Sequence, residues 1–273
     1  MKLGLYLRNM GPQSTRATLL ECALHAESAG IDDLWVADHI AIPPDDAAGS
    51  GGRYLDPIAT LAFLAGATST IHLGTGVLVL PYRPPLATAK WIATVQELSG
   101  GRLMFGVGAG WMKEEFRAVG VDRSRRGSLT DETLEFVHRC FADDEVESNG
   151  QRLLFLPRPA RPPIIVGGRA PYALDRAVRY GDGWMPMRSK PAELRPRIEQ
   201  LRTAMEAAGK PPPEVVLLTS LHLDDPPRAL AQLQEMSDVG VTRVVHAWRY
   251  ADAAEFACAA DRLCHELKRA LSN

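Results

Sequence analysis

The sequence predicts an α/β protein in which eight strand–helix units close into a (β/α)8 barrel, the TIM-barrel fold, with residues 1–273 forming a single domain. Short apolar, β-branched runs alternate along the chain with amphipathic stretches of about 12–18 residues, as expected for strands followed by helices. The alternation occurs eight times, which is the number that closes such a barrel. Apolar runs such as Ile164-Ile165-Val166 are typical of parallel strands covered on both faces. A doubly wound open sheet is the alternative.

The elements follow one another in strict order. Strands are predicted at 3–7, 34–37, 71–80, 103–107, 164–166, 184–186, 215–223 and 241–248. Helices are predicted at 15–29, 56–69, 84–98, 111–140 with an interruption around 120–127, 171–180, 191–208, 229–239 and 253–271. Gly30 ends the first helix, and Pro57 lies in the first turn of the second, where its missing N–H costs nothing. Residues 145–160 are predicted to form an irregular excursion with a small hairpin, and the polar loop 42–53 is a candidate lid.

Composition excludes several classes of function. The 31 basic and 33 acidic side chains give a net charge of −2, so no basic surplus is present to bind a nucleic acid backbone. No apolar run is long enough for a signal peptide core or a membrane span. The four cysteines form no C-x-x-C pair and are interpreted as small core residues of a reducing compartment. We therefore expect a cytoplasmic protein that binds neither nucleic acid nor membrane.

Candidate functional residues lie where the predicted strands end, because the loops after the strands carry the chemistry of such barrels. Glycine is concentrated there, which allows close approach of the backbone to a ligand. The strand ends read Asp38-His39, Thr75-Gly76-Val77, Gly108-Ala109-Gly110-Trp111, Gly167-Gly168-Arg169, Gly183-Trp184 and His246. A dinucleotide-binding G-x-G-x-x-G motif fails because Trp111 stands where the third glycine is required. No group of His, Cys, Asp or Glu has metal-ligand spacing.

Other titratable residues have ordinary structural interpretations. Glu114 and Glu115 begin a predicted helix, where negative charge is favourable without any catalytic purpose. His25 and His138 lie on predicted outer helices and are expected to be solvated.

The chain resembles the luciferase-like flavin and deazaflavin oxidoreductases over nearly its full length. The most specific piece is residues 72–120, supported by WVADH at 35–39 and by residues 161–184. The segment GVGAGWMKEEF is most similar to the branch that uses the deazaflavin coenzyme F420. The resemblance implies hydride transfer to or from a small planar or unsaturated substrate, without activation of oxygen, in a homodimer whose contact includes residues 84–98.

The resemblance also implies roles for the strand-end residues. Asp38 and His39 would lie beside the cofactor ring, with His39 as the proton donor or acceptor, and a non-proline cis peptide at Gly76-Val77, after Thr75, would bulge against the ring. The ring edge would be lined by Gly108, Ala109, Gly110 and Trp111, the phosphate held by Val166, Gly167, Gly168 and Arg169, and the site closed by Gly183 and Trp184. Val77, Trp111 and Trp184 would shape an apolar substrate slot. Trp111 replaces the acidic glutamate of a sugar-phosphate dehydrogenase branch, which argues against that chemistry.

Three alternatives stay open. FMN with oxygen as co-substrate would make the protein a monooxygenase on the same fold. Four arginines, Arg53, Arg83, Arg169 and Arg188, could meet the polyanionic tail that a deazaflavin carries and FMN lacks. A phosphate-binding barrel lyase or isomerase is disfavoured because the predicted strand ends offer neither a lysine nor paired carboxylates. A flavin-binding protein without turnover is the third alternative.

Overall fold

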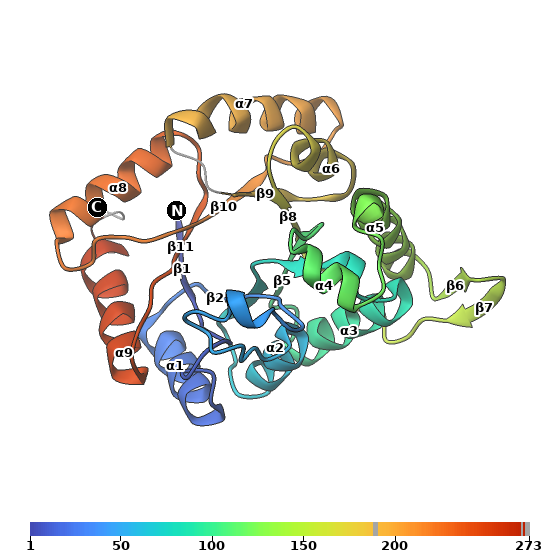
Figure 1. The fold of residues 1–273 in the computed structure, drawn as a ribbon. Coiled ribbons are helices and arrows are strands. Elements are labelled where there is room, and N and C mark those ends of the chain that lie inside the picture. Colours follow the sequence, from blue (N-terminus) through green and yellow to red (C-terminus); the bar gives the residue numbers. More distant parts are fainter. Residues whose placement is uncertain (188–190, 269, 271–273) are drawn as a thin grey trace.

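A computed structural model of the chain describes residues 1–187, 191–268 and 270. Parallel strands form a central ring, and helices surround it (Figure 1). The strands are β1 (Lys2–Tyr6), β2 (Asp33–Val36), β3 (His72–Thr75), β4 (Leu78–Val79), β5 (Leu103–Gly108), β8 (Ile164–Gly168), β9 (Gly183–Pro186), β10 (Glu214–Thr219) and β11 (Arg243–His246). Pairing of β1 with β11 and of β3 with β5 closes the ring, so the predicted (β/α)8 barrel is confirmed.

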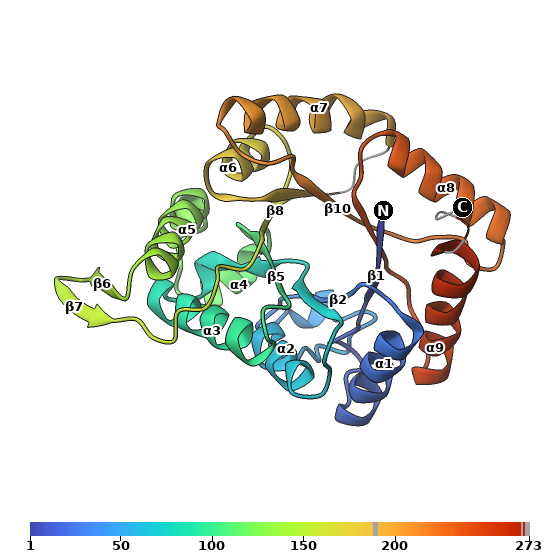
Figure 2. The ribbon, with the colours of Figure 1, turned by 180° about the vertical axis from the view of Figure 1, so that it is seen from behind.

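The helices lie on the outside of the ring, as the same molecule seen from behind also shows (Figure 2). They are α1 (Arg16–Ala29), α2 (Pro57–Ala65), α3 (Pro85–Leu98), α4 (Lys113–Ala118), α5 (Arg126–Ala142), α6 (Tyr172–Tyr180), α7 (Pro191–Ala207), α8 (Pro226–Asp238) and α9 (Ala253–Asp261). Side chains that accept a hydrogen bond from the first turn fix several starts: Thr15 caps α1 and Asp56 caps α2. Gly30 ends α1 with φ 86°, a conformation that favours glycine.

Alternation along the strands separates two apolar layers. Outward-facing residues such as Leu7, Val166 and Trp184 join the large core between the strands and the helices. Inward-facing residues, including Trp35 and Met185, fill the centre of the barrel. The barrel is therefore a packed core, and only the ends of its strands are available for chemistry.

Several boundaries differ from the sequence-based expectation. The predicted strand 71–80 is divided into β3 and β4 at Gly76-Val77, and a π-helix (Arg262–Lys268) continues α9. Residues 145–160 contain the antiparallel hairpin of β6 (Glu145–Ser148) and β7 (Gln151–Leu154), which projects beyond α3 and α5 (Figures 1 and 2). Cys22, Cys140 and Cys264 are buried as expected, but Cys258 is exposed, because its helix presents that position to solvent.

No helix within the described ranges has both the length and the apolar content needed to cross a bilayer.

Candidate active site

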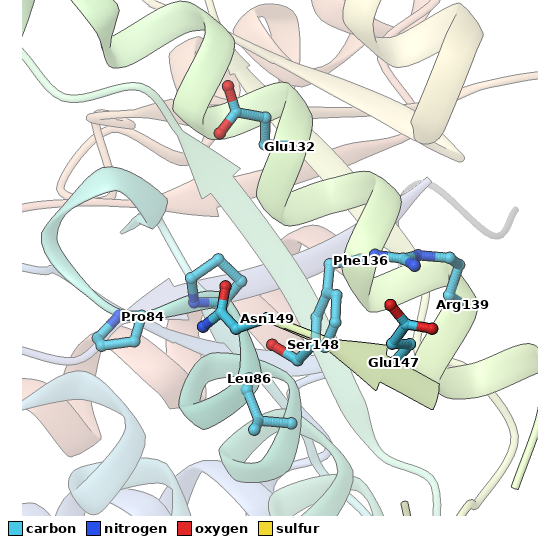
Figure 3. A pocket seen from close by; sticks show the side chains of 9 residues that line it. Pro84, Leu86, Glu132, Phe136, Arg139, Glu147, Ser148 and Asn149 are labelled. Atoms are coloured by element: carbon cyan, nitrogen blue, oxygen red, sulfur yellow. The ribbon is translucent and has the colours of Figure 1, made fainter. Parts of the chain in front are cut away.

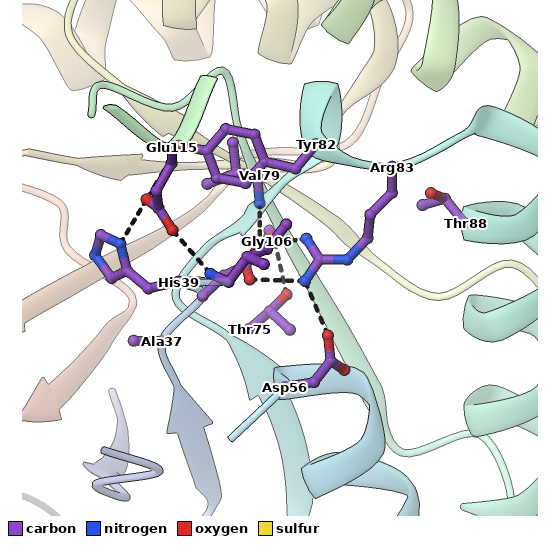
Figure 4. A network of polar contacts seen from close by, with 12 residues as sticks. Ala37, His39, Asp56, Thr75, Val79, Tyr82, Arg83, Thr88, Gly106 and Glu115 are labelled. Atoms are coloured by element: carbon purple, nitrogen blue, oxygen red, sulfur yellow. Dashed lines mark hydrogen bonds and ion pairs between the residues drawn. The ribbon is translucent and has the colours of Figure 1, made fainter. Parts of the chain in front are cut away.

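Asp38, just beyond β2, is held in a closed ionic network with Arg83 and Asp56, the two members that Figure 4 labels. Its carboxylate accepts two hydrogen bonds from the Arg83 guanidinium, at 2.6 and 2.8 Å, and a third from the backbone N–H of Val79 at 2.8 Å. Arg83 also donates to Asp56 at 2.9 Å, and both Asp38 and Arg83 are almost inaccessible to solvent. Burial opposes the charge of Arg83, but its two acidic partners outweigh burial and raise its pKa. Asp38 thus anchors β4 and the start of α2.

His39 has a different partner, Glu115 of α4. The Nδ1 atom of His39 lies 2.8 Å from Oε2 of Glu115, and Tyr82 donates its hydroxyl to the same oxygen at 3.2 Å (Figure 4). The other oxygen of Glu115 accepts from the backbone N–H groups of Ile40 and Ala41 at 2.8 and 3.3 Å. Burial alone would raise the pKa of Glu115, but the hydrogen bonds from His39 and the two backbone groups outweigh it and lower the pKa. Glu115 is therefore a carboxylate, and His39 carries its proton on Nδ1.

The opposite nitrogen of His39 is the reactive one. No described residue forms a hydrogen bond with Nε2, and the side chain is 19% exposed. The ring of Tyr54 lies 5.0 Å from the imidazole, and the ring of Trp111 approaches it edge-on at 6.2 Å. With Nδ1 protonated, Nε2 is a base that can accept a proton, and after protonation it can donate one.

The peptide bond between Gly76 and Val77 is cis, as the family resemblance implied. The Val77 side chain projects over two glycines of neighbouring strands: a Cβ atom on Gly108 would lie 2.6 Å from one methyl group of Val77, and a Cβ on Gly167 would lie 2.7 Å from the other. These two glycines were expected to admit a ligand to the backbone. Their immediate effect is instead to admit Val77, which covers them and presents an apolar surface at the end of the barrel.

Backbone donors and one cation border that surface. In the described part of the chain, no residue accepts a hydrogen bond from the backbone N–H groups of Ala109, Gly110, Arg169 and Ala170. They lie just after β5 and β8, which pair with each other in the barrel. The Arg169 side chain is exposed. An apolar platform next to free N–H donors and an arginine fits a flat heterocycle with a phosphorylated arm.

Some residues predicted for the site have other contacts. Trp184 was expected to line the substrate slot, but its ring packs in the outer core. Its Nε1–H donates to the carbonyl oxygen of Gly168 at 2.9 Å. Its role is therefore restricted to holding Gly168. The Thr75 hydroxyl donates a hydrogen bond to the carbonyl oxygen of Gly106 at 2.6 Å. Gly183 was expected at a strand end, but it is the first residue of β9 and pairs with Glu214 at the start of β10, so it lies at the opposite end of its strand from the site.

Of the four arginines predicted to meet a cofactor tail, Arg83 and Arg53 have partners within the protein. Arg83 is occupied by its two carboxylates, so that prediction is wrong for Arg83. Arg53 donates to the hydroxyl and carbonyl oxygens of Ser14 and fastens the loop 42–53 to the segment after β1. Arg188 lies outside the described residues. Of the three arginines that the structure describes, Arg169 is the one whose side chain forms no hydrogen bond or ion pair with another described residue.

Two further histidines are also unlike the expectation. His138 is half-buried and lies 2.8 Å from the Tyr180 carbonyl oxygen, so it is not simply solvated. His246 follows the strand alternation to the outer side, where it stacks on Trp248. Burial lowers its pKa to about 4, and its Nδ1 accepts the Leu221 N–H.

A pocket of about 440 Å³ lies outside the strand ring, between the start of α3, α5 and the β6–β7 hairpin (Figure 3). It shares no lining residue with the His39 site. Across the described ranges, no group of three His, Cys, Asp or Glu side chains is arranged to hold a metal ion.

Sequence reasoning missed Glu115. Two adjacent glutamates at a helix start were interpreted as a favourable interaction with the helix dipole, which describes Glu114 but not Glu115. Glu115 lies on the buried face of α4, beside Phe116. Its position before a large apolar residue was the available signal, but the partner is 76 residues away, and only the fold brings the two together.

Comparisons with known proteins identify what the chain is similar to. A family model described as luciferase-like monooxygenase matches residues 1–268. An uncharacterized protein of Mycobacterium tuberculosis is 32% identical over 245 residues, which cover 82% of each chain. A 5,10-methylenetetrahydromethanopterin reductase of Methanolobus tindarius is 30% identical over 196 residues, covering 70% of this chain and 56% of the reductase.

Solved structures share the fold. The monooxygenase RslO1 from Streptomyces bottropensis superposes with a TM-score of 0.84 at 20% identity, covering 99% of this chain and 100% of that one. An F420-dependent secondary alcohol dehydrogenase, in complex with an F420–acetone adduct, gives 0.80 at 18% identity and 98% coverage of both chains. An FMN-containing Baeyer–Villiger monooxygenase component from Pseudomonas putida gives 0.79 at 15% identity, covering 98% of this chain and 97% of that one. Relatives of both cofactor types therefore have this barrel.

Proposed function

Because the chain belongs to the luciferase-like monooxygenase family, whose members are oxidoreductases, we propose that it is a coenzyme F420-dependent oxidoreductase that transfers a hydride to or from a small, planar or unsaturated substrate. The observation that carries the proposal is the His39–Glu115 pair. It supplies a proton donor and acceptor at the strand end where the family resemblance places the ring.

His39 moves the proton that accompanies the hydride. Its Nε2 atom removes a proton from a substrate hydroxyl during oxidation, or returns one to a carbonyl oxygen during reduction. Glu115 stabilises the imidazolium that forms, because its buried negative charge faces Nδ1 and the carboxylate is already held by Ile40 and Ala41. Tyr82 and the two backbone groups keep that carboxylate in place.

The remaining residues orient the cofactor. A bound deazaflavin would supply two-electron hydride chemistry without reaction with oxygen. Val77 would support the flat ring, the N–H groups of Ala109, Gly110, Arg169 and Ala170 would hold its phosphorylated arm, and Arg169 would add a cation. Trp111, which is 65% exposed, would cover the ring edge and exclude water.

The FMN-dependent monooxygenase is the second candidate. The FMN-containing barrel with a TM-score of 0.79 supports it, and the same platform and N–H donors fit FMN. In an FMN-dependent reaction, His39 would exchange a proton with a group derived from O2 and not with a substrate alcohol.

Cofactor reconstitution separates the two candidates. The purified chain is titrated with F420 and, separately, with FMN, and binding is followed by cofactor fluorescence. We expect F420 to bind with a Kd at least ten times lower than that of FMN, and a panel of alcohols and enones to change the 420 nm absorbance of the bound cofactor. FMN binding without F420 binding, accompanied by substrate-dependent oxygen uptake, would reverse the assignment.

We further propose that the protein is a homodimer. Trp91 and Leu98 on α3 are 41% and 62% exposed, and Leu154 and Leu156 near the hairpin are 74% and 53% exposed. Apolar side chains in such number on neighbouring elements are typical of an interface. Sedimentation of the wild type and of Leu98→Glu would test it: we expect a dimer that the substitution weakens.

A further inference from the structure

Arg8, two residues beyond β1, is a buried cation without an acidic partner. Arg8 is only 9% exposed to solvent. Nη2 donates to the Gly49 carbonyl at 3.2 Å, whereas Nε is buried and no described residue accepts its hydrogen. Among the described residues no carboxylate forms an ion pair with Arg8. Buried guanidinium groups are normally paired, because an uncompensated buried charge is costly. The protein therefore retains here a charge that its own side chains do not neutralise.

The backbone around Arg8 is firmly held, so the position of its side chain is not accidental. The Arg8 N–H donates to the Tyr250 hydroxyl at 2.9 Å. The next residue, Asn9, donates to the carbonyls of Ala37 and Leu55, both at 2.8 Å, and accepts from the Ala37 N–H at 3.0 Å. These contacts tie the segment after β1 to β2 and to the chain that leaves the 42–53 loop.

The guanidinium of Arg8 lies at the end of the barrel that carries His39, because its Nη2 donates to Gly49 of the loop that follows β2. β1 ends at Tyr6, which packs on the inner cluster. The charge of Arg8 acts on the Tyr6 phenol, whose pKa burial nonetheless raises. The Tyr6 hydroxyl, too, has no hydrogen-bond partner in the described part of the chain. Tyr54 forms an isolated antiparallel β-bridge with Met10, and its ring lies 5.0 Å from the His39 ring. The segment that follows Arg8 is therefore connected to His39 through Tyr54.

We propose that Arg8, together with the Tyr6 hydroxyl, binds a carboxylate group of the substrate. This inference rests on the proposed function and narrows its substrate class to organic acids, whose reacting carbon would lie toward His39 and the Val77 platform. A guanidinium forks onto a carboxylate through two parallel N–H donors, and a phenol can add a third. The Arg8–Gly49 contact then couples acid binding to the loop 42–53.

A binding experiment on the chain of residues 1–273, without cofactor, tests the proposal. Benzoate, its neutral analogue benzamide, and inorganic phosphate are titrated by calorimetry into the wild type and Arg8→Gln. We expect benzoate to bind at least tenfold more tightly than benzamide and than phosphate, and Arg8→Gln to lose at least tenfold in benzoate affinity. Arg249→Gln is the matched control: Arg249 lies against the same Gly49 but is exposed, and benzoate affinity should stay within twofold.

Each other outcome overturns the proposal in a specific way. Equal benzoate binding by the wild type and Arg8→Gln means that Arg8 only fastens the loop, which faster proteolysis of residues 42–53 in the variant would show independently. Tighter binding of phosphate than of benzoate assigns a phosphate site. Loss of F420 affinity in Arg8→Gln, with unchanged affinity for the ring fragment that lacks the phosphorylated arm, assigns Arg8 to the cofactor. Arg8→Lys provides a second variant that keeps the charge, and it should lose less benzoate affinity than Arg8→Gln.

The result of this experiment does not depend on whether the proposed function is correct. Benzoate binding requires no cofactor, so F420 that does not bind leaves this result intact, and benzoate that does not bind leaves the cofactor titration intact.

Discussion

Two buried carboxylates, Asp38 and Glu115, lie at the same end of the barrel but do different work. Asp38 is saturated: Arg83 and the Val79 N–H occupy both of its oxygens, and Arg83 in turn contacts Asp56. Glu115 is also fully hydrogen-bonded, but one of its partners is an imidazole whose second nitrogen is left open. The first network is closed on a permanent cation, whereas the second ends on an imidazole nitrogen that can accept and donate a proton.

Structural and functional polar groups in this site differ in where their hydrogen-bond networks end. Burial and hydrogen-bond satisfaction are similar for the two acids. The difference lies in the last member of each chain of contacts: Arg83 cannot release a proton, and His39 can. Asp38 and His39 are neighbours in sequence, and the pair suggests an acid–imidazole unit, yet the acid that holds His39 comes from α4.

The largest effect is expected from breaking the closed network. Arg83→Gln leaves Asp38 buried with its charge uncompensated, so we expect the free energy of unfolding to fall by about 3–5 kcal/mol. Urea denaturation measures the loss. Arg125→Gln, which removes an exposed ion pair with Glu132, is the control and should cost less than about 1 kcal/mol. Equal small losses in both variants would contradict a structural role for Arg83.

Breaking the open network should affect turnover more than stability. Glu115→Gln removes the charge that stabilises protonated His39 and offers Nδ1 an amide in its place. We expect kcat for hydride transfer to fall about 100- to 1,000-fold, as measured by stopped-flow absorbance with a substrate from the cofactor screen. His39→Gln should match this loss, and the double variant should add little. An unchanged kcat in a folded Glu115→Gln protein would remove Glu115 from the mechanism.

The platform between the two networks offers an intermediate effect. In Gly167→Ala the new methyl group meets Val77 at 2.7 Å, and we expect a loss of about 1–3 kcal/mol in stability from overpacking. Combining it with Val77→Ala should recover part of that loss, because the contacted methyl group is gone. Thermal denaturation of the two single variants and the double variant closes the cycle. Additive losses would show that Val77 does not fill the space over Gly167.

The smallest effect is expected in the acid range. The pKa of Glu115 is lower in the folded chain than its ordinary value of 4.5. Its contribution to stability is therefore complete above pH 4.5 and is lost as the pH falls through the folded value. Wild type and Glu115→Gln should thus differ in the pH dependence of unfolding below pH 4.5, with the steeper decline in the wild type. Parallel curves would mean that Glu115 has no depressed pKa.

The order of strands and helices and most of the glycines at the strand ends could be predicted from the sequence, because hydrophobic period and turn residues are local properties. The family resemblance added the cis bond at Gly76-Val77 and the importance of His39. Tertiary structure alone decided the partners. Glu115 reaches His39 across 76 residues, and Arg83 reaches Asp38 across 45. Val77 fills the space over Gly108 and Gly167, and the side that Trp184 faces follows from strand alternation once the register is set. Contacts of this kind depend on how the ring closes, so the residues around Glu115 can indicate that it is buried but not which partner it meets.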